Sequence, residues 1–200
     1  ASQVAGQVAS QMAGQVADTG ADAGPDAGWL LLDAEADART PSPAQRAASR
    51  AQGRALLRIA RTTWPHPALD ALHDVHIGSA ADRRFTAGKD GRGPHHPIVL
   101  GAATAAADGA PAQAAAIAAY GSVTGPAAAA VRLLGLDPLA VHRMLAGLAA
   151  DVDAIAAQAA AAAGAAGGEG GWARLPAPSA PALDVYAERH LGSETRLFES

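Results

Sequence analysis

Histidines are the residues of this sequence best suited to acid–base chemistry or metal binding, and most of the seven lie between Trp64 and His96. His73 and His76 are three residues apart, so they would share one face of a helix, and imidazole is a suitable ligand for nickel, zinc or copper. The chain has no cysteine, however, and the carboxylates near these histidines follow no recognised ligand spacing. We therefore predict no metal ligand and no cofactor-binding residue, and we expect replacement of His73 and His76 to leave nickel affinity unchanged.

Catalysis would need a nucleophile beside a base, or two carboxylates placed for proton transfer. The sequence offers neither spacing, so we predict no catalytic residue and no enzymatic activity. Two other classes remain, a protein-interaction role and a small histidine-based nickel sensor or store. Equilibrium dialysis separates them, because a sensor binds nickel tightly on its own whereas a scaffold needs its partners.

Four arginines recur at every fourth residue and would form a basic ridge along one face of a helix. This helix is predicted to begin at the capping box SPAQ, residues 42–45, and to run to about Thr63. The ridge could bind an acidic partner surface, or it could pair with the acidic turn at residues 33–37. Pairing within the chain is the favoured interpretation. The four residues are Arg46, Arg50, Arg54 and Arg58.

Composition favours helices and argues against several classes of partner. Alanine, the best helix former, is the commonest of the 200 residues, whereas aromatic residues make up only 4%. A net charge of −4 gives no electrostatic reason to expect a nucleic-acid partner. The uncharged stretch at residues 109–131 is long enough to span a membrane, but two prolines interrupt it and it is mostly Ala and Gly, so no membrane span is predicted. Without cysteine or a visible signal peptide, a cytoplasmic location is expected.

Residues 96–148 organise the rest of the chain, and we expect four helices there, joined by very short turns. Pro97 opens the first helix, and the Asp-Gly-Ala-Pro turn at residues 108–111 separates it from the second. Gly125 and Pro126 are predicted to open the third, and an Asp-Pro pair then caps and starts the fourth. The predicted fold class is therefore all-α, a compact multi-helix domain with short turns.

The same periodicity predicts which side chains face the core. In the fourth of these helices apolar residues recur at three- and four-residue steps, which indicates one buried face. Small residues would let the helices approach closely, at the cost of little apolar area per residue. The predicted inward-facing residues are Leu56, Ile59 and Ala60 in the arginine-bearing helix; Ile98, Val99, Leu100, Ile117, Tyr120, Val131, Leu134 and Leu136 in the first three central helices; Leu139, His142, Met144, Leu145 and Leu148 in the fourth; Val152, Ile155 and Ala159 in the next; and Leu183 and Tyr186 near the carboxyl end.

The two ends of the chain differ in character from this central part. Residues 1–28 contain a four-residue repeat (QVAG, QVAS, QMAG, QVAD) followed by a Gly-rich stretch, and we expect a flexible, low-complexity extension. The domain itself is expected to cover residues 29–200. A helix is predicted at about residues 181–191, and an apolar and basic tail follows it that should dock on the domain or on a partner. The tail residues are Arg196, Leu197 and Phe198.

Several blocks, taken in order, resemble one known family. They are LDAEADARTPSPAQRAASRAQGRALLR (32–58), HHPIVLGAA (95–103), AAYGSVTGPAAAAVRLLGLDP (118–138) and ETRLFES (194–200). Together they are similar to the UreF type of urease accessory protein, over roughly residues 29–200. Nothing before Trp29 matches the family's first helical segment with its Gly-, His- and Ser-rich turn, which predicts an atypical or truncated amino terminus.

This resemblance implies a UreF-like, all-helical and non-catalytic chaperone or scaffold for urease maturation. Proteins of this type form homodimers and bridge a UreD/UreH-type protein to the GTPase UreG, so that nickel is inserted into apo-urease. By position, the resemblance assigns partner binding to His96 and Pro97, to Gly125 and Pro126, and to Arg196, Leu197 and Phe198.

Overall fold

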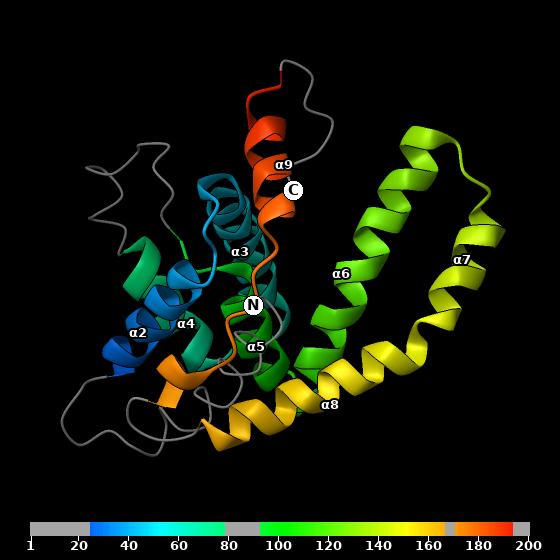
Figure 1. The fold of residues 1–200 in the computed structure, drawn as a ribbon. Coiled ribbons are helices and arrows are strands. Elements are labelled where there is room, and N and C mark those ends of the chain that lie inside the picture. Colours follow the sequence, from blue (N-terminus) through cyan, green and yellow to red (C-terminus); the bar gives the residue numbers. More distant parts are fainter. Residues whose placement is uncertain (1–24, 79–92, 167–170, 194–200) are drawn as a thin grey trace.

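The computed structural model describes residues 25–78, 93–166 and 171–193, and this part of the chain contains eight α-helices, one short 3-10 helix and no strand (Figure 1). The predicted all-α fold class is therefore confirmed. The four-residue repeat and the tail residues Arg196, Leu197 and Phe198 lie outside the described residues. The elements are α2 (Pro25–Ala38), α3 (Pro43–Thr63), α4 (Pro67–Ile77), α5 (His96–Ala106), α6 (Pro111–Leu134), α7 (Pro138–Gly147), α8 (Ala149–Ala165), η2 (Gly171–Arg174) and α9 (Pro181–Leu191).

Prolines and capping side chains mark where the helices begin. At the start of α3 the Ser42 hydroxyl accepts a hydrogen bond from the Gln45 backbone N–H, at 3.1 Å. At the start of α7 the Asp137 carboxylate accepts the backbone N–H groups of Leu139 and Ala140. These bonds satisfy donors that have no partner inside the helix, and they place both helix starts where the sequence predicted them. The bounds predicted near Thr63 and at residues 181–191 are likewise confirmed in α3 and α9.

The first region of the fold, which we call the body, comprises α2 to α5, η2 and α9. Its core combines large side chains from four helices, and Trp172 of η2 and the end of α8 cover one side of it. Burial of such side chains is the main stabilising contribution to a domain of this size. The buried core residues include Trp29 and Leu32 of α2, Leu57 of α3, Leu69 and Leu72 of α4, and Ile98 and Val99 of α5.

The second region, which we call the arm, comprises α6, α7 and α8. Helices α6 and α8 pack along each other, and α7 joins their far ends away from the body (Figure 1). The small core between α6 and α8 consists of Ala115, Ala156 and Ala159. Alanine allows the two helix backbones to approach closely, but it removes little apolar surface from water.

The prediction that Gly125 and Pro126 open a new helix is wrong, because α6 runs without a break from Pro111 to Leu134. Pro126 lacks the N–H that would bond to the Ser122 carbonyl, yet both residues lie on the exposed side of α6, where water can bond to that carbonyl. Gly125 also has no Cβ to clash with the proline ring that follows it. The central stretch therefore contains three helices, not four.

Several predicted inward faces are also wrong, because their apolar side chains are exposed. Leu139 is 74% exposed and Leu134 is 71% exposed, although both belong to regular apolar stripes. A stripe with helical period identifies the apolar face of a helix. It does not show whether other residues of the same chain pack against that face. The other exposed residues of these predicted faces are Ile59, Ile117, Tyr120, Leu136, His142, Met144, Ile155, Leu183 and Tyr186.

Helix α6 is also long and apolar enough to cross a membrane, with 22% of its most apolar window buried. Helices α7 and α8, bent by 46° relative to each other, would form a second candidate span. This is weak evidence for a membrane protein, because core helices of soluble proteins pass the same test.

Candidate functional site: a cluster of carboxylates and histidines

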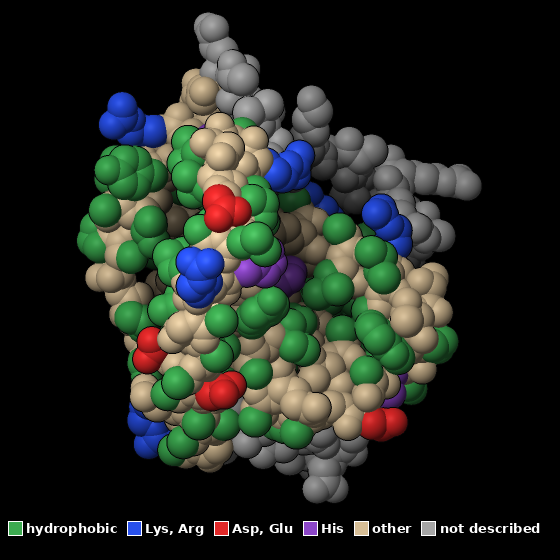
Figure 2. Space-filling model, turned by 90° about the vertical axis from the view of Figure 1, so that its right-hand side faces the viewer, with side chains coloured by type: hydrophobic (Ala, Val, Ile, Leu, Met, Phe, Trp, Pro, Cys, Tyr) green, Lys and Arg blue, Asp and Glu red, His purple; other side chains and the backbone are tan. Residues whose placement is uncertain are grey.

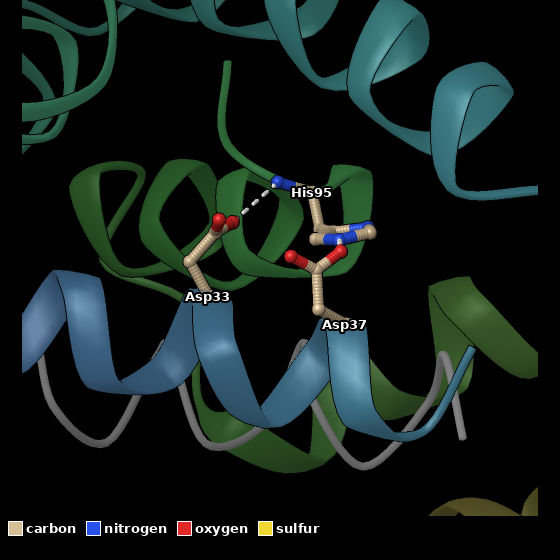
Figure 3. A group of neighbouring side chains, drawn as sticks. All are labelled: Asp33, Asp37 and His95. Atoms are coloured by element: carbon tan, nitrogen blue, oxygen red, sulfur yellow. Dashed lines mark hydrogen bonds and ion pairs between the residues drawn. The ribbon is translucent and has the colours of Figure 1, made fainter. Parts of the chain in front are cut away.

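Four helices of the body place charged and imidazole side chains around one point. Asp33 and Asp37 lie four residues apart on α2, so they project from the same face of that helix. They point toward His95, which immediately precedes α5 (Figure 3). Arg50 of α3 and His76 of α4 reach the same carboxylates from the other two helices.

The contacts within this cluster divide the carboxylate oxygens into two sets. Arg50 Nη2 lies 2.7 Å from Asp33 Oδ2 and 2.7 Å from Asp37 Oδ2. The Oδ1 atoms face the histidine side: the His95 backbone N–H donates to Asp33 Oδ1 at 3.1 Å, and His95 Nε2 lies 2.8 Å from Asp37 Oδ1. The side chain of His95 is only 1% exposed. The cluster is thus an ion-pair network in which each carboxylate has a partner on both oxygens, and in which the Asp37 side chain remains 43% exposed.

Helix α3 holds the turn before α5 through its other contacts. Ser49 Oγ lies 3.0 Å from His95 Nδ1 and accepts the backbone N–H of His96 at 3.2 Å. Gly53 lets the two segments approach, because a Cβ at this position would lie 2.0 Å from the Pro94 carbonyl oxygen. Glycine is therefore required at this crossing for steric reasons.

His76 is the one member of the cluster with an unsatisfied atom. Its side chain is 5% exposed, and its Nδ1 lies 3.1 Å from the Leu72 carbonyl, to which it can only donate. Its Nε2 has no hydrogen-bond partner and lies 3.7 Å from Asp33 Oδ1. With the proton on Nδ1, the unprotonated Nε2 lies near the carboxylate without a donor between them.

Burial and charge set the protonation of these groups. Burial alone would raise the pKa of Asp37, but hydrogen bonds from His95 and Arg50 and the charge of Arg50 outweigh it and hold this pKa below its ordinary value of 3.8. Burial lowers the pKa of His76 below 6.5, against the opposing effect of Asp33. Burial also lowers the pKa of His96. At neutral pH, Asp37 is therefore ionised, and His76 and His96 carry neutral imidazoles.

The favoured interpretation of the arginine ridge is confirmed for its first half. Arg50 pairs with Asp33 and Asp37, and Arg46 Nε lies 4.0 Å from Asp37 Oδ1. The second half, with Arg54 and Arg58, lines a groove of about 520 Å³ between α3 and α4. The spacing of Asp33 and Asp37 opposite the ridge was therefore a usable signal for the ion pairs. No signal in the sequence pointed to His95, which joins the cluster only through the tertiary fold.

The structure does not bring the residues predicted to bind partners into one site. His96 is half-buried and Pro97 is buried at the start of α5, whereas Gly125 and Pro126 are exposed along the arm. The remaining three, Arg196, Leu197 and Phe198, lie outside the part of the chain that the structure describes.

The two histidines predicted to share a helix face have different partners. Nδ1 of His73 lies 3.0 Å from Asp74 Oδ1, whereas His76 contacts the Leu72 carbonyl and Asp33. His73 and His76 therefore have different partners, although both belong to α4.

Comparisons with known proteins point to one family. The sequence model of UreF matches residues 7–149. This range includes most of the four-residue repeat, although we expected no likeness to the family before Trp29. The chain is 43% identical over 169 residues to a urease accessory protein UreF of Mycobacterium sp. (strain JLS), covering 84% of this chain and 65% of that protein. It is 40% identical over 168 residues to that of Mycolicibacterium vanbaalenii, and 38% identical over 168 residues to that of Mycobacterium tuberculosis; each match covers 84% of this chain.

The chain thus spans 64% to 65% of the length of these curated relatives. No solved structure matches it.

Proposed function

The chain belongs to the UreF family, and from this we propose that it is a non-catalytic accessory protein for urease maturation. In this role it bridges a UreD/UreH-type protein to the GTPase UreG, so that nickel is inserted into apo-urease. The observation that carries the proposal is the family match over residues 7–149, together with relatives named urease accessory proteins. The work takes place in the cytoplasm, without a nucleic-acid or membrane partner.

The arrangement of the ionisable cluster supports a non-catalytic role. The Asp33 and Asp37 carboxylates are already occupied by Arg50 and by His95, and His95 is buried. A general base must reach the proton of a substrate, directly or through one water. In this arrangement the carboxylates hold the turn that starts α5.

The arm supports an interaction role, and we propose that its apolar surface binds a second copy of this chain. Residues 111–150 carry only three charged side chains, Arg132, Asp137 and Arg143. Figure 2 shows this side of the molecule, where hydrophobic side chains are spread widely and charges are isolated. A groove of about 330 Å³ among α6, α7 and α8 is lined by Tyr120, Val123 and Leu145, among others. A nearly uncharged surface can face its own copy without bringing like charges together.

The tail is the proposed contact for the UreD/UreH-type partner. Helix α9 has no buried residue and ends at Leu191, just before Gly192 and Ser193. Arginine and phenylalanine dominate interface energetics when they are desolvated, so Arg196 and Phe198 are the expected anchors. His96 and Pro97, with Gly125 and Pro126, remain proposed partner-binding residues by position in the family.

Co-purification with the UreD/UreH-type protein and UreG tests this function, and three variants separate its parts. Deletion of residues 192–200 should abolish capture of the UreD/UreH-type protein while circular dichroism stays unchanged. Leu139→Glu should weaken self-association at least tenfold, about 1.4 kcal/mol, because it buries a charge in the proposed dimer interface. Ile59→Glu places the same charge at an exposed site on the body and is the control. It should change neither the capture of the UreD/UreH-type protein nor self-association. If the wild-type chain captures no urease accessory protein, the proposal is wrong.

A further inference from the structure

The ion pairs of the cluster beside α5 do not explain the position of the His76 imidazole. His76 Nε2 is buried and has no hydrogen-bond partner, yet it lies 3.7 Å from Asp33 Oδ1. Its Nδ1 is committed to the Leu72 carbonyl at 3.1 Å, so in the neutral ring the unprotonated Nε2 lies near a carboxylate oxygen. Two acceptors facing each other in a buried site repel, and a cation between them would remove the repulsion.

The atoms around this point form a set of possible ligands. Asp33, Asp37 and His95 each offer one ligand atom, and these three atoms lie within 4.8 Å of one another. His76 Nε2 lies outside this set, 3.7 Å from Asp33 Oδ1, so its ring must move toward Asp37 and His95 to supply a fourth ligand. Two ligands that each bond to one ion at about 2.1 Å lie roughly 3.4 Å apart when their geometry is tetrahedral, so the separation of His76 and Asp33 needs little adjustment.

We propose that Asp33, Asp37, His76 and His95 bind one divalent transition-metal ion at this point. Two imidazoles and two carboxylates suit nickel, zinc or cobalt, whereas magnesium and calcium favour sites made of oxygen ligands alone. The proposal replaces our expectation that His76 takes no part in metal binding. It does not depend on the accessory role, because the ligands all belong to the isolated chain.

The surrounding residues provide the outer contacts that a metal site needs. The Nδ1–H of His76 donates to the Leu72 carbonyl, which fixes the ring with Nε2 toward the ion. Arg50 holds the Oδ2 atoms of Asp33 and Asp37, so their Oδ1 atoms stay turned toward the histidines.

His95 can adapt without losing a proton. When the ion takes Nε2, the single ring proton moves to Nδ1 and donates to Ser49 Oγ, which lies 3.0 Å away. The ion then replaces the contact between His95 Nε2 and Asp37. The positive charge of Arg50 opposes the ion, which favours an exchangeable metal over a permanently held one.

Calorimetric titration of the metal-free full chain with nickel chloride, and separately with zinc chloride, tests the site. We expect one ion per chain, and we expect His76→Gln to lower the affinity at least tenfold. His73→Gln is the matched control, one turn earlier on the same helix with its ring on Asp74, and it should bind as the wild type does. No binding by the wild type, or equal effects of the two variants, would overturn the proposal.

A second measurement keeps the test valid if His76→Gln does not fold. Titration of the wild-type chain with zinc chloride should shift the imidazole NMR signals of His76 and His95 and leave those of His142 unchanged. Shifts confined to other histidines would place the ion elsewhere and overturn the proposal. A chain that binds zinc here but captures no urease accessory protein would retain this site while refuting the accessory function.

Discussion

The body and the arm are both built from helices, yet they bury their apolar residues in opposite ways. In the body, Trp29, Leu57 and Leu69 are completely buried. In the arm, the buried contacts between α6 and α8 are made by alanines, while Leu134 and Leu139 face outward. Alanine favours the helix, but burial of its single methyl group contributes only about 0.8 kcal/mol, less than burial of the four side-chain carbons of leucine. The core of the body therefore buries more apolar surface than the arm, and the arm leaves large side chains exposed, as the proposed self-association requires.

The largest expected difference between the two regions is the loss of unfolding free energy when a leucine in each is replaced by alanine. Leu57→Ala removes a fully buried side chain from the body and should lower the free energy of unfolding by about 2–5 kcal/mol. Leu134→Ala removes an exposed one from the arm and should change it by less than about 0.5 kcal/mol. Urea denaturation measures both, at a concentration where light scattering finds monomers. Equal losses would contradict the comparison.

A second test uses glycines and predicts effects of opposite sign. Gly53→Ala places a Cβ against the Pro94 carbonyl in the body and should cost about 1–3 kcal/mol. Gly121→Ala in α6 meets no atom within 4 Å and should stabilise the arm by about 1 kcal/mol, because alanine is the better helix former. Thermal unfolding of both variants provides the measurement. A stabilising Gly53→Ala would show that α3 does not need to approach the turn before α5 so closely.

The same contrast explains how far the sequence could predict the fold. Local signals were sufficient for helix boundaries: Ser42 capped α3, and proline at the first position marked α9. They failed at Pro126, because whether a proline ends a helix depends on whether water reaches the carbonyl that it leaves unpaired. They failed again for Leu139, because periodicity identifies an apolar face without identifying what covers it.

The candidate site was predictable only where its residues are close in sequence. Asp33 and Asp37 share a helix face by their spacing, and arginines at a four-residue period lie on a neighbouring helix, so their pairing could be foreseen. His95 is 58 residues from Asp37 in the chain and enters the cluster only when α5 packs on α3. Contacts of this kind depend on tertiary packing, which a single sequence does not reveal.

The smallest expected effect concerns α9, which belongs to the body but has no buried residue. Glu188 accepts hydrogen bonds from the Ser42 hydroxyl and from the Ala44 backbone N–H, the latter at 2.9 Å, at the start of α3. A carboxylate is favoured there because the first N–H groups of a helix lack partners and carry partial positive charge. This contact ties α9 to the start of α3 through an ionised side chain.

Glu188→Gln should therefore speed amide exchange in α9 severalfold at neutral pH while leaving α3 and α5 unchanged. Asp184→Asn is the control, since it removes a charge from the same helix without removing the bonds to α3.

Acid should act in the same direction as Glu188→Gln, because the Ser42 hydroxyl and the Ala44 N–H hold the pKa of Glu188 below its ordinary value of 4.5. Because the folded pKa is the lower one, the contribution of Glu188 is present above about pH 4.5 and is lost as the pH falls through the folded value. NMR signals of α9 should broaden in that range in the wild type and show no such transition in Glu188→Gln. A wild-type α9 that keeps its signals at pH 3 would mean that apolar contacts, and not this carboxylate, hold it to the body.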